Sequence, residues 1–367
     1  MGGLPVGRGR RVQMRLSIPH NLSMQIYVNP VQQQHAPRFE FFRGERVRCL
    51  EGPTRAAFVE QALRTRGYVL HVPEVDSTPQ LQRIHTSRYM DFLRTAWDEW
   101  LALDALNAEV QPFPSVWPVR TLRSDVEPRN FIARLGLYSM DNGSPLSAGT
   151  WAAAKAGADV AASAAQALLK GERAAFCATR PPGHHAGPDF MGGYCFLNNA
   201  AVAAQALRDG GAARVAVLDV DYHHGNGTQA CFYERADVLF VSIHGDPRTE
   251  YPFYLGHADE TGAGEGAGFN LNLPLAAGCS VADWFGALDT ACERVARYGA
   301  DALVVSLGLD TFVGDPNCTF SLRAADFNQL GARLAQLALP TVYVLEGGHA
   351  AAELGENAAA VIDGFES

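Results

Sequence analysis

From about residue 150 onward, short apolar runs alternate with longer segments that have helical periodicity. Five apolar runs are predicted to be buried strands: 174–179, 214–220, 238–243, 302–307 and 341–345. Helices are predicted beside them, at about 150–170, 198–210, 280–299 and 324–339. We expect Thr150 to cap the first helix and Gly171 to end it. Strands that are apolar at successive positions are covered on both faces, so the pattern predicts an α/β fold with a central parallel sheet and helices on both faces.

Polar residues follow each of these strands. They are Gly183-His184-His185, Asp219 to His223, Ser242 with His244, Asp310, and Glu346 to His349. Because such sheets bind ligands just beyond the carboxyl ends of their strands, we expect these residues to form one site.

Residues 1–150 are less regular, and 101–134 is interpreted as loop insertions into the same domain.

The second of these groups has the spacing of metal ligands. Residues two apart in an extended chain point the same way, so Asp219, Asp221 and His223 share one side. A carboxylate and an imidazole at neighbouring positions suit a divalent metal, and Asp310 is the best third ligand. Three protein ligands would leave one position open, as in catalytic zinc sites. A single Asp–His pair is better explained as a satisfied polar cluster, but the whole set favours a metal site.

The tandem pair His184 and His185 stands in a loop bounded by proline and glycine. Histidine is the natural general acid or base near neutral pH. Each ring needs a partner on its second nitrogen, and Asp219 and Asn226 are the candidates. On this motif alone, a surface loop with incidental histidines is an equally good interpretation. The sequence has no HExxH, GxSxG or GxxxxGK[ST] motif, so it does not indicate a serine or cysteine nucleophile.

Composition excludes several classes of function. The formal net charge of −9 argues against nucleic-acid binding and favours a cationic partner. No apolar run approaches the roughly 20 residues that span a bilayer, so no membrane partner is expected. The seven cysteines are odd in number and contain no CxxC pair, which points to a reducing cytoplasm.

The N-terminus is interpreted separately from the rest of the chain. Residues 1–39 contain no acid but include Arg8, Arg10, Arg11 and Arg15, and no apolar run of a secretory signal follows these arginines. We expect translation to begin at Met24, with 1–23 a disordered or non-native extension; an organelle transit peptide is the alternative. Residues 24–367 are then a single catalytic domain.

Five motifs in this order resemble the histone deacetylase superfamily, and most of all its acetylpolyamine amidohydrolases. They are Arg180-Pro-Pro-Gly-His-His-Ala-Gly, Asp219-Val-Asp-Tyr-His-His-Gly-Asn-Gly, Val241-Ser-Ile-His-Gly-Asp-Pro, Gly308-Leu-Asp-Thr and Glu346-Gly-Gly. The resemblance covers about residues 24–365 and implies the arginase-deacetylase fold. Arginases share that fold, but their two-manganese motifs do not match this sequence.

The resemblance also implies a role for each matching residue. The zinc ligands would be Asp221, His223 and Asp310. His185 would be the general base, oriented by Asn226, and His184 would stabilise charge, oriented by Asp219. A structural potassium ion would bind Asp219, Ser242 and the backbone carbonyls of Asp221 and His223. Tyr194 and Tyr251 would form walls of a narrow substrate tunnel.

His349 departs from the family pattern. Acetylpolyamine amidohydrolases have a tyrosine here, which donates a hydrogen bond to the developing oxyanion, and one vertebrate class with histidine hydrolyses acetyl-lysine poorly. The resemblance therefore implies slow turnover of simple acetyl amides by this chain.

The substrate is expected to be a small cationic acylated amine. Residues 137–151 and 251–266 resemble acetylpolyamine amidohydrolases more than histone deacetylases. In that family an early inserted loop packs across a homodimer, and residues 101–134 match its place. Glu109, Asp125 and Glu127 in this loop would face a polyamine, or else are ordinary solvated acids. The alternative functions are a lysine deacylase of the histone deacetylase type and an acyl-ligand binding protein with weak turnover.

Overall fold

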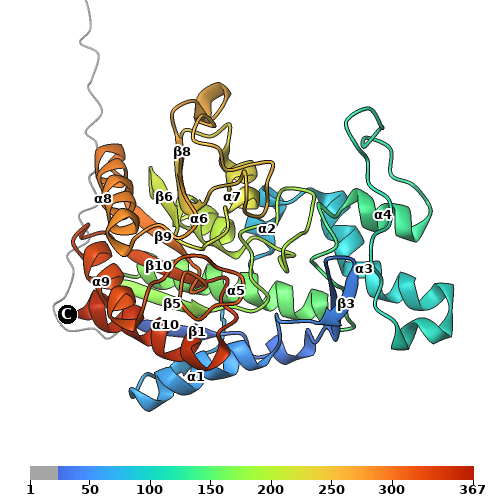
Figure 1. The fold of residues 1–367 in the computed structure, drawn as a ribbon, viewed down its shortest axis with the longest axis horizontal. Helices are drawn as coiled ribbons and strands as arrows, with labels where there is room; N and C mark the ends of the chain where they lie inside the picture. The colour runs from blue at the N-terminus through green and yellow to red at the C-terminus, as the bar shows by residue number, and fades with distance from the viewer. Residues whose placement is uncertain (1–23) are drawn as a thin grey trace, which may run out of the picture.

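Eight parallel strands form the centre of the protein, in the spatial order β4-β1-β5-β10-β9-β6-β7-β8 (Figure 1). The computed structural model describes residues 24–367, so the predicted extension at 1–23 lies outside the described residues. The strands of the sheet are β1 (Gln25–Val28), β4 (Leu70–His71), β5 (Ala174–Ala178), β6 (Val215–Asp219), β7 (Val238–Gly245), β8 (Asn270–Leu275), β9 (Ala302–Leu307) and β10 (Thr341–Leu345). The predicted parallel sheet is confirmed.

Helices cover both faces of this sheet. One face packs against α2 (Thr78–Ile84), α3 (Ser87–Leu103), α4 (Phe131–Leu137), α5 (Thr150–Leu169), α6 (Asn199–Asp209) and α7 (Asn226–Phe232). The other face packs against α1 (Thr54–Thr65), α8 (Val281–Tyr298), α9 (Ala324–Ala335) and α10 (Ala351–Glu366). Alternate strand residues enter the two cores: Cys177 and Val304 lie in the first, and Phe176 and Val305 in the second. This is why the central strands are apolar at nearly every position.

The helix boundaries follow local capping chemistry in most cases. Asn198 accepts a hydrogen bond from the Ala201 amide, and Ser280 forms a capping box with Asp283. The prediction that Thr150 caps α5 is wrong, because Gly149 is the N-cap residue and Thr150 is the first helical residue. The Thr150 hydroxyl instead accepts a hydrogen bond from the Ser147 amide.

Two additions lie outside the central layers. A small antiparallel hairpin is formed by β2 (Phe39–Phe42) and β3 (Glu45–Arg48). The predicted insertion at 101–134 contains the end of α3, a 3-10 turn at Ala105–Glu109 and the start of α4. Figure 1 shows that this region, in teal, lies at one margin of the molecule. Within residues 24–367, no helix combines the length and apolarity that a membrane span requires.

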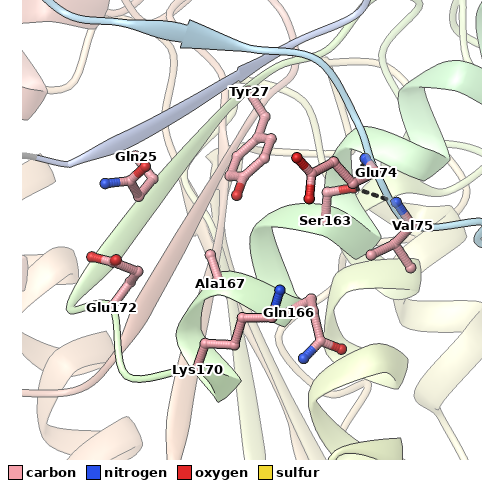
Figure 2. Close-up of a pocket in the computed structure, with 9 residues that line it drawn as sticks. All are labelled: Gln25, Tyr27, Glu74, Val75, Ser163, Gln166, Ala167, Lys170 and Glu172. Carbon is pink, nitrogen blue, oxygen red and sulfur yellow. Dashed lines mark hydrogen bonds between the residues drawn. The ribbon is translucent and has the colours of Figure 1, made fainter.

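A pocket of about 120 Å³ lies between β1 and α5 (Figure 2). The Ser163 hydroxyl at its edge accepts hydrogen bonds from the Glu74 and Val75 amides. The residues that line it are Gln25, Tyr27, Glu74, Val75, Ser163, Gln166, Ala167, Lys170 and Glu172. None of the predicted site residues is among them, so this pocket is separate from the candidate site.

Candidate active site

The candidate site lies where β5, β6, β9 and β10 end. These strands are neighbours in the sheet, because β10 lies between β5 and β9, and β6 is on the far side of β9. The last residue of β6, Asp219, and the loops that leave the four strands carry the residues of the site: 183–185, 219–223, 308–310 and 346–349. The sheet topology thus brings together residues that are more than 160 positions apart in the sequence.

Asp221, His223 and Asp310 form a compact group of possible metal ligands. Their ligand atoms all lie within 4.8 Å of one another. The Nδ1 atom of His223 is 3.1 Å from an Asp310 oxygen and 3.3 Å from an Asp221 oxygen. Both carboxylates are buried.

The chemistry of this group fits a divalent cation. Burial and the Asp221 carboxylate raise the pKa of Asp310 to about 7, because two buried acids repel one another. A cation between them would remove that repulsion, and imidazole nitrogen and carboxylate oxygen are both ligands that bind zinc in proteins. The prediction of a metal site is therefore compatible with the geometry.

Backbone amides hold both carboxylates in place. The Tyr222 amide donates to Asp310 at 2.8 Å, and the His223 and Gly347 amides donate to the two oxygens of Asp221. Position 347 must be glycine, since a Cβ atom there would lie 2.5 Å from an Asp221 oxygen and 2.6 Å from an Asp310 oxygen. Such support is typical of metal ligands, whose orientation depends on their outer partners.

His184 and His185 lie side by side but have different partners. Their ring centroids are 4.0 Å apart. The Nδ1 atom of His184 is 3.0 Å from Asp219, and that of His185 is 2.7 Å from the Asn226 side-chain oxygen. The structure therefore brings together both orienting pairs that the sequence predicts.

The surroundings of the two rings shift their pKa values in opposite directions. Burial lowers the pKa of His184, but the Asp221 and Asp219 carboxylates outweigh it and raise this pKa to about 10. Burial and the positive His184 hold the pKa of His185 well below its usual value. The Asn226 oxygen can only accept, so it keeps a proton on Nδ1 of His185 and leaves the Nε2 lone pair free. Neighbouring groups with opposite shifts of pKa are typical of acid–base sites.

Asp219 and Ser242, the predicted potassium ligands, are paired in register between β6 and β7. Both residues are fully buried. The Ser242 hydroxyl lies 2.8 Å from Nδ1 of His244, and Asp219 accepts a hydrogen bond from the Asp221 amide. The potassium site stays a prediction.

The two predicted tunnel tyrosines lie beside the histidines. The Tyr251 ring stands perpendicular to the His185 ring at 5.0 Å, and the Tyr194 ring is 5.5 Å from the His349 ring. A residue that the sequence reasoning missed links Tyr251 to the residue before Tyr194: the half-buried Asp141 carboxylate accepts hydrogen bonds from the Tyr251 hydroxyl at 2.6 Å and the Gly193 amide at 3.2 Å. Asp141 stands in the stretch 137–151 that resembles the amidohydrolases, but nothing in its sequence spacing links it to Tyr251.

Arg55 of α1 is a second residue that the sequence reasoning missed. Its side chain is buried, donates to the carbonyl oxygens of Glu346 and Gly348 at 2.6 Å each, and pairs with Glu51 at 2.9 Å. It thereby supports the loop that carries His349. A signal was present, because Arg55 shares one helical face with Val59 and a charge on an apolar face requires a buried partner.

The acids of the inserted loop make local contacts within the described chain. Asp125 pairs with Arg123, and Glu127 accepts a hydrogen bond from the Tyr138 hydroxyl. The Glu109 side chain is 83% exposed and lies 3.7 Å from Arg38. Their role toward a polyamine stays a prediction.

Comparison with known proteins places this arrangement in a family. The histone deacetylase domain matches residues 49–365. The chain belongs to the histone deacetylase family. Similar proteins in this family are named acetylpolyamine amidohydrolases, which act on amide bonds. The prediction that this chain is a hydrolase of that class is confirmed.

Relatives with assigned activities resemble this deacetylase-family chain along most of its length. Acetylpolyamine amidohydrolase 2 of Pseudomonas aeruginosa is 49% identical over 333 residues, which cover 90% of this chain and 96% of that protein. The acetylpolyamine amidohydrolase of Mycoplana ramosa is 42% identical over 326 residues, covering 89% and 94%. The crystal structure of an acetylpolyamine aminohydrolase from Burkholderia pseudomallei has a TM-score of 0.88 and 40% identity, and covers 94% of this chain and 98% of that one. The predicted arginase-deacetylase fold is thus confirmed.

Proposed function

We propose that this protein is a zinc-dependent amidohydrolase that removes acetyl groups from acetylated polyamines. The observation that carries the proposal is a group of possible metal ligands beside two histidines with different partners; Nε2 of His184 lies 3.8 Å from an Asp221 oxygen. The relatives named acetylpolyamine amidohydrolases support the substrate class.

The residues of the chain supply proton transfer and positioning. Zinc held by Asp221, His223 and Asp310 would act as a Lewis acid on the acetyl carbonyl and on the attacking water. His185 accepts the proton of that water at Nε2 and later donates it to the leaving amine. His184, which Asp219 keeps protonated, stabilises the negative charge that develops on the carbonyl oxygen. Tyr194 and Tyr251 confine the acyl group beside these histidines.

The surroundings of the site support a small cationic substrate and a homodimer. A net charge of −9 attracts cationic polyamines. Exposed apolar side chains gather on the inserted loop and its flanks, where each of the following is more than half exposed: Leu103, Leu106, Val110, Val116, Val119, Leu122 and Val126. Apolar surface of this kind indicates a protein interface, and a second copy of this chain is the partner that we propose. A structural potassium ion at Asp219 and Ser242 is part of the same proposal.

We place the enzyme in the cytoplasm, where thiols stay reduced. All seven cysteines are free, and they all lie in the described part of the chain. This agrees with a reducing compartment.

A turnover assay tests the substrate class. The zinc-loaded protein is given an acetylated polyamine, an acetyl-lysine peptide and an acetylated histone at equal concentrations. We expect the highest kcat/KM on the acetylated polyamine. A higher value on the peptide or the histone would instead favour the lysine deacylase. Binding of all three without turnover would favour an acyl-ligand binding protein.

A further inference from the structure

His349 has one ring nitrogen with a partner and one without. Its Nδ1 atom lies 3.4 Å from the side-chain nitrogen of Asn317. Its Nε2 atom is buried and has no hydrogen-bond partner among the described residues. A buried polar atom without a partner is unfavourable, so this atom points to a group that a bound ligand supplies.

The contact with Asn317 determines which nitrogen carries the proton. An amide nitrogen can donate a hydrogen bond but cannot accept one. When it faces Nδ1 of a neutral imidazole, Nδ1 must be the acceptor and the proton must lie on Nε2. Burial and the nearby Arg55 lower the pKa of His349 to about 3, so the ring is neutral and has a single proton.

Asn317 and His349 are fixed to one another through Asp315. One Asp315 oxygen accepts a hydrogen bond from the backbone amide of Asn317 at 3.0 Å, and the other accepts one from the backbone amide of His349 at 2.5 Å. At the preceding residue, Arg55 donates a hydrogen bond to the Gly348 carbonyl oxygen. The backbone of His349 is therefore held on both sides, and its ring centroid lies 5.5 Å from that of Tyr194.

We propose that Asn317 is a positioning residue that keeps the proton of His349 on Nε2, so that this N–H donates a hydrogen bond to the carbonyl oxygen of the bound amide. The inference rests on the proposed function, because it assigns a role within that reaction. It gives His349 the role of stabilising the developing oxyanion through its Nε2–H group, and it gives Asn317 the role of keeping the proton on that nitrogen.

Nitrogen NMR tests the tautomer independently of activity. Zinc-loaded protein labelled with ¹⁵N-histidine is studied by long-range ¹H–¹⁵N correlation, which distinguishes protonated from unprotonated ring nitrogens. The His349 signals are assigned by their absence in His349→Phe. We expect a protonated Nε2 and an unprotonated Nδ1 in the wild type. A proton on Nδ1 would overturn the proposal, because Asn317 would then be turned to accept.

Variants at position 317 connect the tautomer with the reaction. Asn317→Leu removes the donor, so we expect it to shift the His349 signals toward the other tautomer. Asn328→Leu is the matched control: Asn328 is exposed on α9, and its loss should leave these signals unchanged. Unchanged signals in Asn317→Leu would overturn the proposal.

Kinetics on an acetylated polyamine gives the second measurement. We expect Asn317→Leu to lower kcat roughly tenfold with little change in KM, which is less than the hundred- to thousandfold cost of losing a whole oxyanion donor. In the His349→Phe background the same substitution should have no further effect. Additive losses would show that Asn317 does not act through His349. If wild type does not turn over this substrate, the proposed function fails, while the NMR result still decides the tautomer.

Discussion

Asp310 contributes to the candidate site through its charge and its hydrogen bonds. One of its oxygens accepts the Tyr222 amide, and the other faces His223, so no apolar contact would replace it. Its carboxylate lies close to that of Asp221, and of these two carboxylates the positive His184 ring contacts only that of Asp221, at 3.8 Å. The proposed cation would therefore balance charge that His184 alone does not.

We predict that Asp310→Ala abolishes amide hydrolysis and strongly reduces metal content. The substitution removes one of three ligands, and two are too few for a stable zinc site. Elemental analysis of purified protein measures the metal, and an acetylated polyamine serves as the substrate. Asp259→Ala, at an exposed aspartate, is the matched control. Full metal occupancy in Asp310→Ala would show that the ligand assignment is wrong.

We predict that His349→Tyr raises kcat on acetyl amides with little change in metal content. A tyrosine hydroxyl stands farther from the backbone than the histidine Nε2 atom, so it donates a shorter hydrogen bond to the oxyanion than the one that we propose for His349. A trifluoroacetyl amide, whose carbonyl is already activated, should gain less. The two kcat ratios are the measurement. Fast wild-type turnover of acetyl amides and no gain in the variant would mean that His349 already performs as well as tyrosine.

At the scale of elements, the first helix supports the last loop. Arg55 of α1 holds the 346–349 loop through two carbonyl oxygens, and its charge is balanced by Glu51. Glu51 also pairs with the buried Arg180, 3.0 Å away. This buried ionic group therefore joins α1 to the ends of β5 and β10.

We predict that Arg55→Met lowers the free energy of unfolding by about 3 kcal/mol, the lower end of the range for breaking a buried ion pair, because Arg180 still balances Glu51. Urea denaturation measures this value. Arg64→Met on the same helix is the control, since Arg64 is exposed and lies 3.9 Å from Glu60, and it should change stability by about 0.5 kcal/mol or less. Equal effects of the two substitutions would rule out a structural role for the buried pair.

The sequence predicted the elements whose patterns are local. The five central strands are apolar at nearly every position because both faces are covered, and their polar ends marked the site. The edge strand β8 was missed because Asn270 and Asn272 alternate with leucines, as in a half-buried strand. The role of Asp141 was missed because its contact with Tyr251 spans 110 residues. Contacts of this kind depend on the tertiary fold, and the local spacing of apolar and polar residues does not predict them.

At the scale of the whole molecule, the inserted loop carries much of the exposed apolar surface. Leu106 is 75% exposed and Val119 is 62% exposed. Single exposed apolar residues are common, but a cluster on one segment indicates a partner surface. This supports the proposed homodimer.

We predict that Leu106→Glu and Val119→Glu together convert the dimer to a monomer, because two charges would then be buried without partners. Analytical ultracentrifugation measures the mass in solution. Val69→Glu, at a residue that is 70% exposed outside the loop, should leave the mass unchanged. A monomeric wild type would contradict the proposed assembly.

The position of β10 has a consequence for how the protein is made. It is the last strand in the sequence, yet it lies inside the sheet between β5 and β9. During synthesis the sheet therefore lacks the strand between β5 and β9 until residue 345 has left the ribosome. Strands β5 and β9 expose unpaired edges in that interval, and such edges are prone to aggregate. Nascent chains that stop before β10 should accordingly depend on chaperones far more than the finished enzyme does.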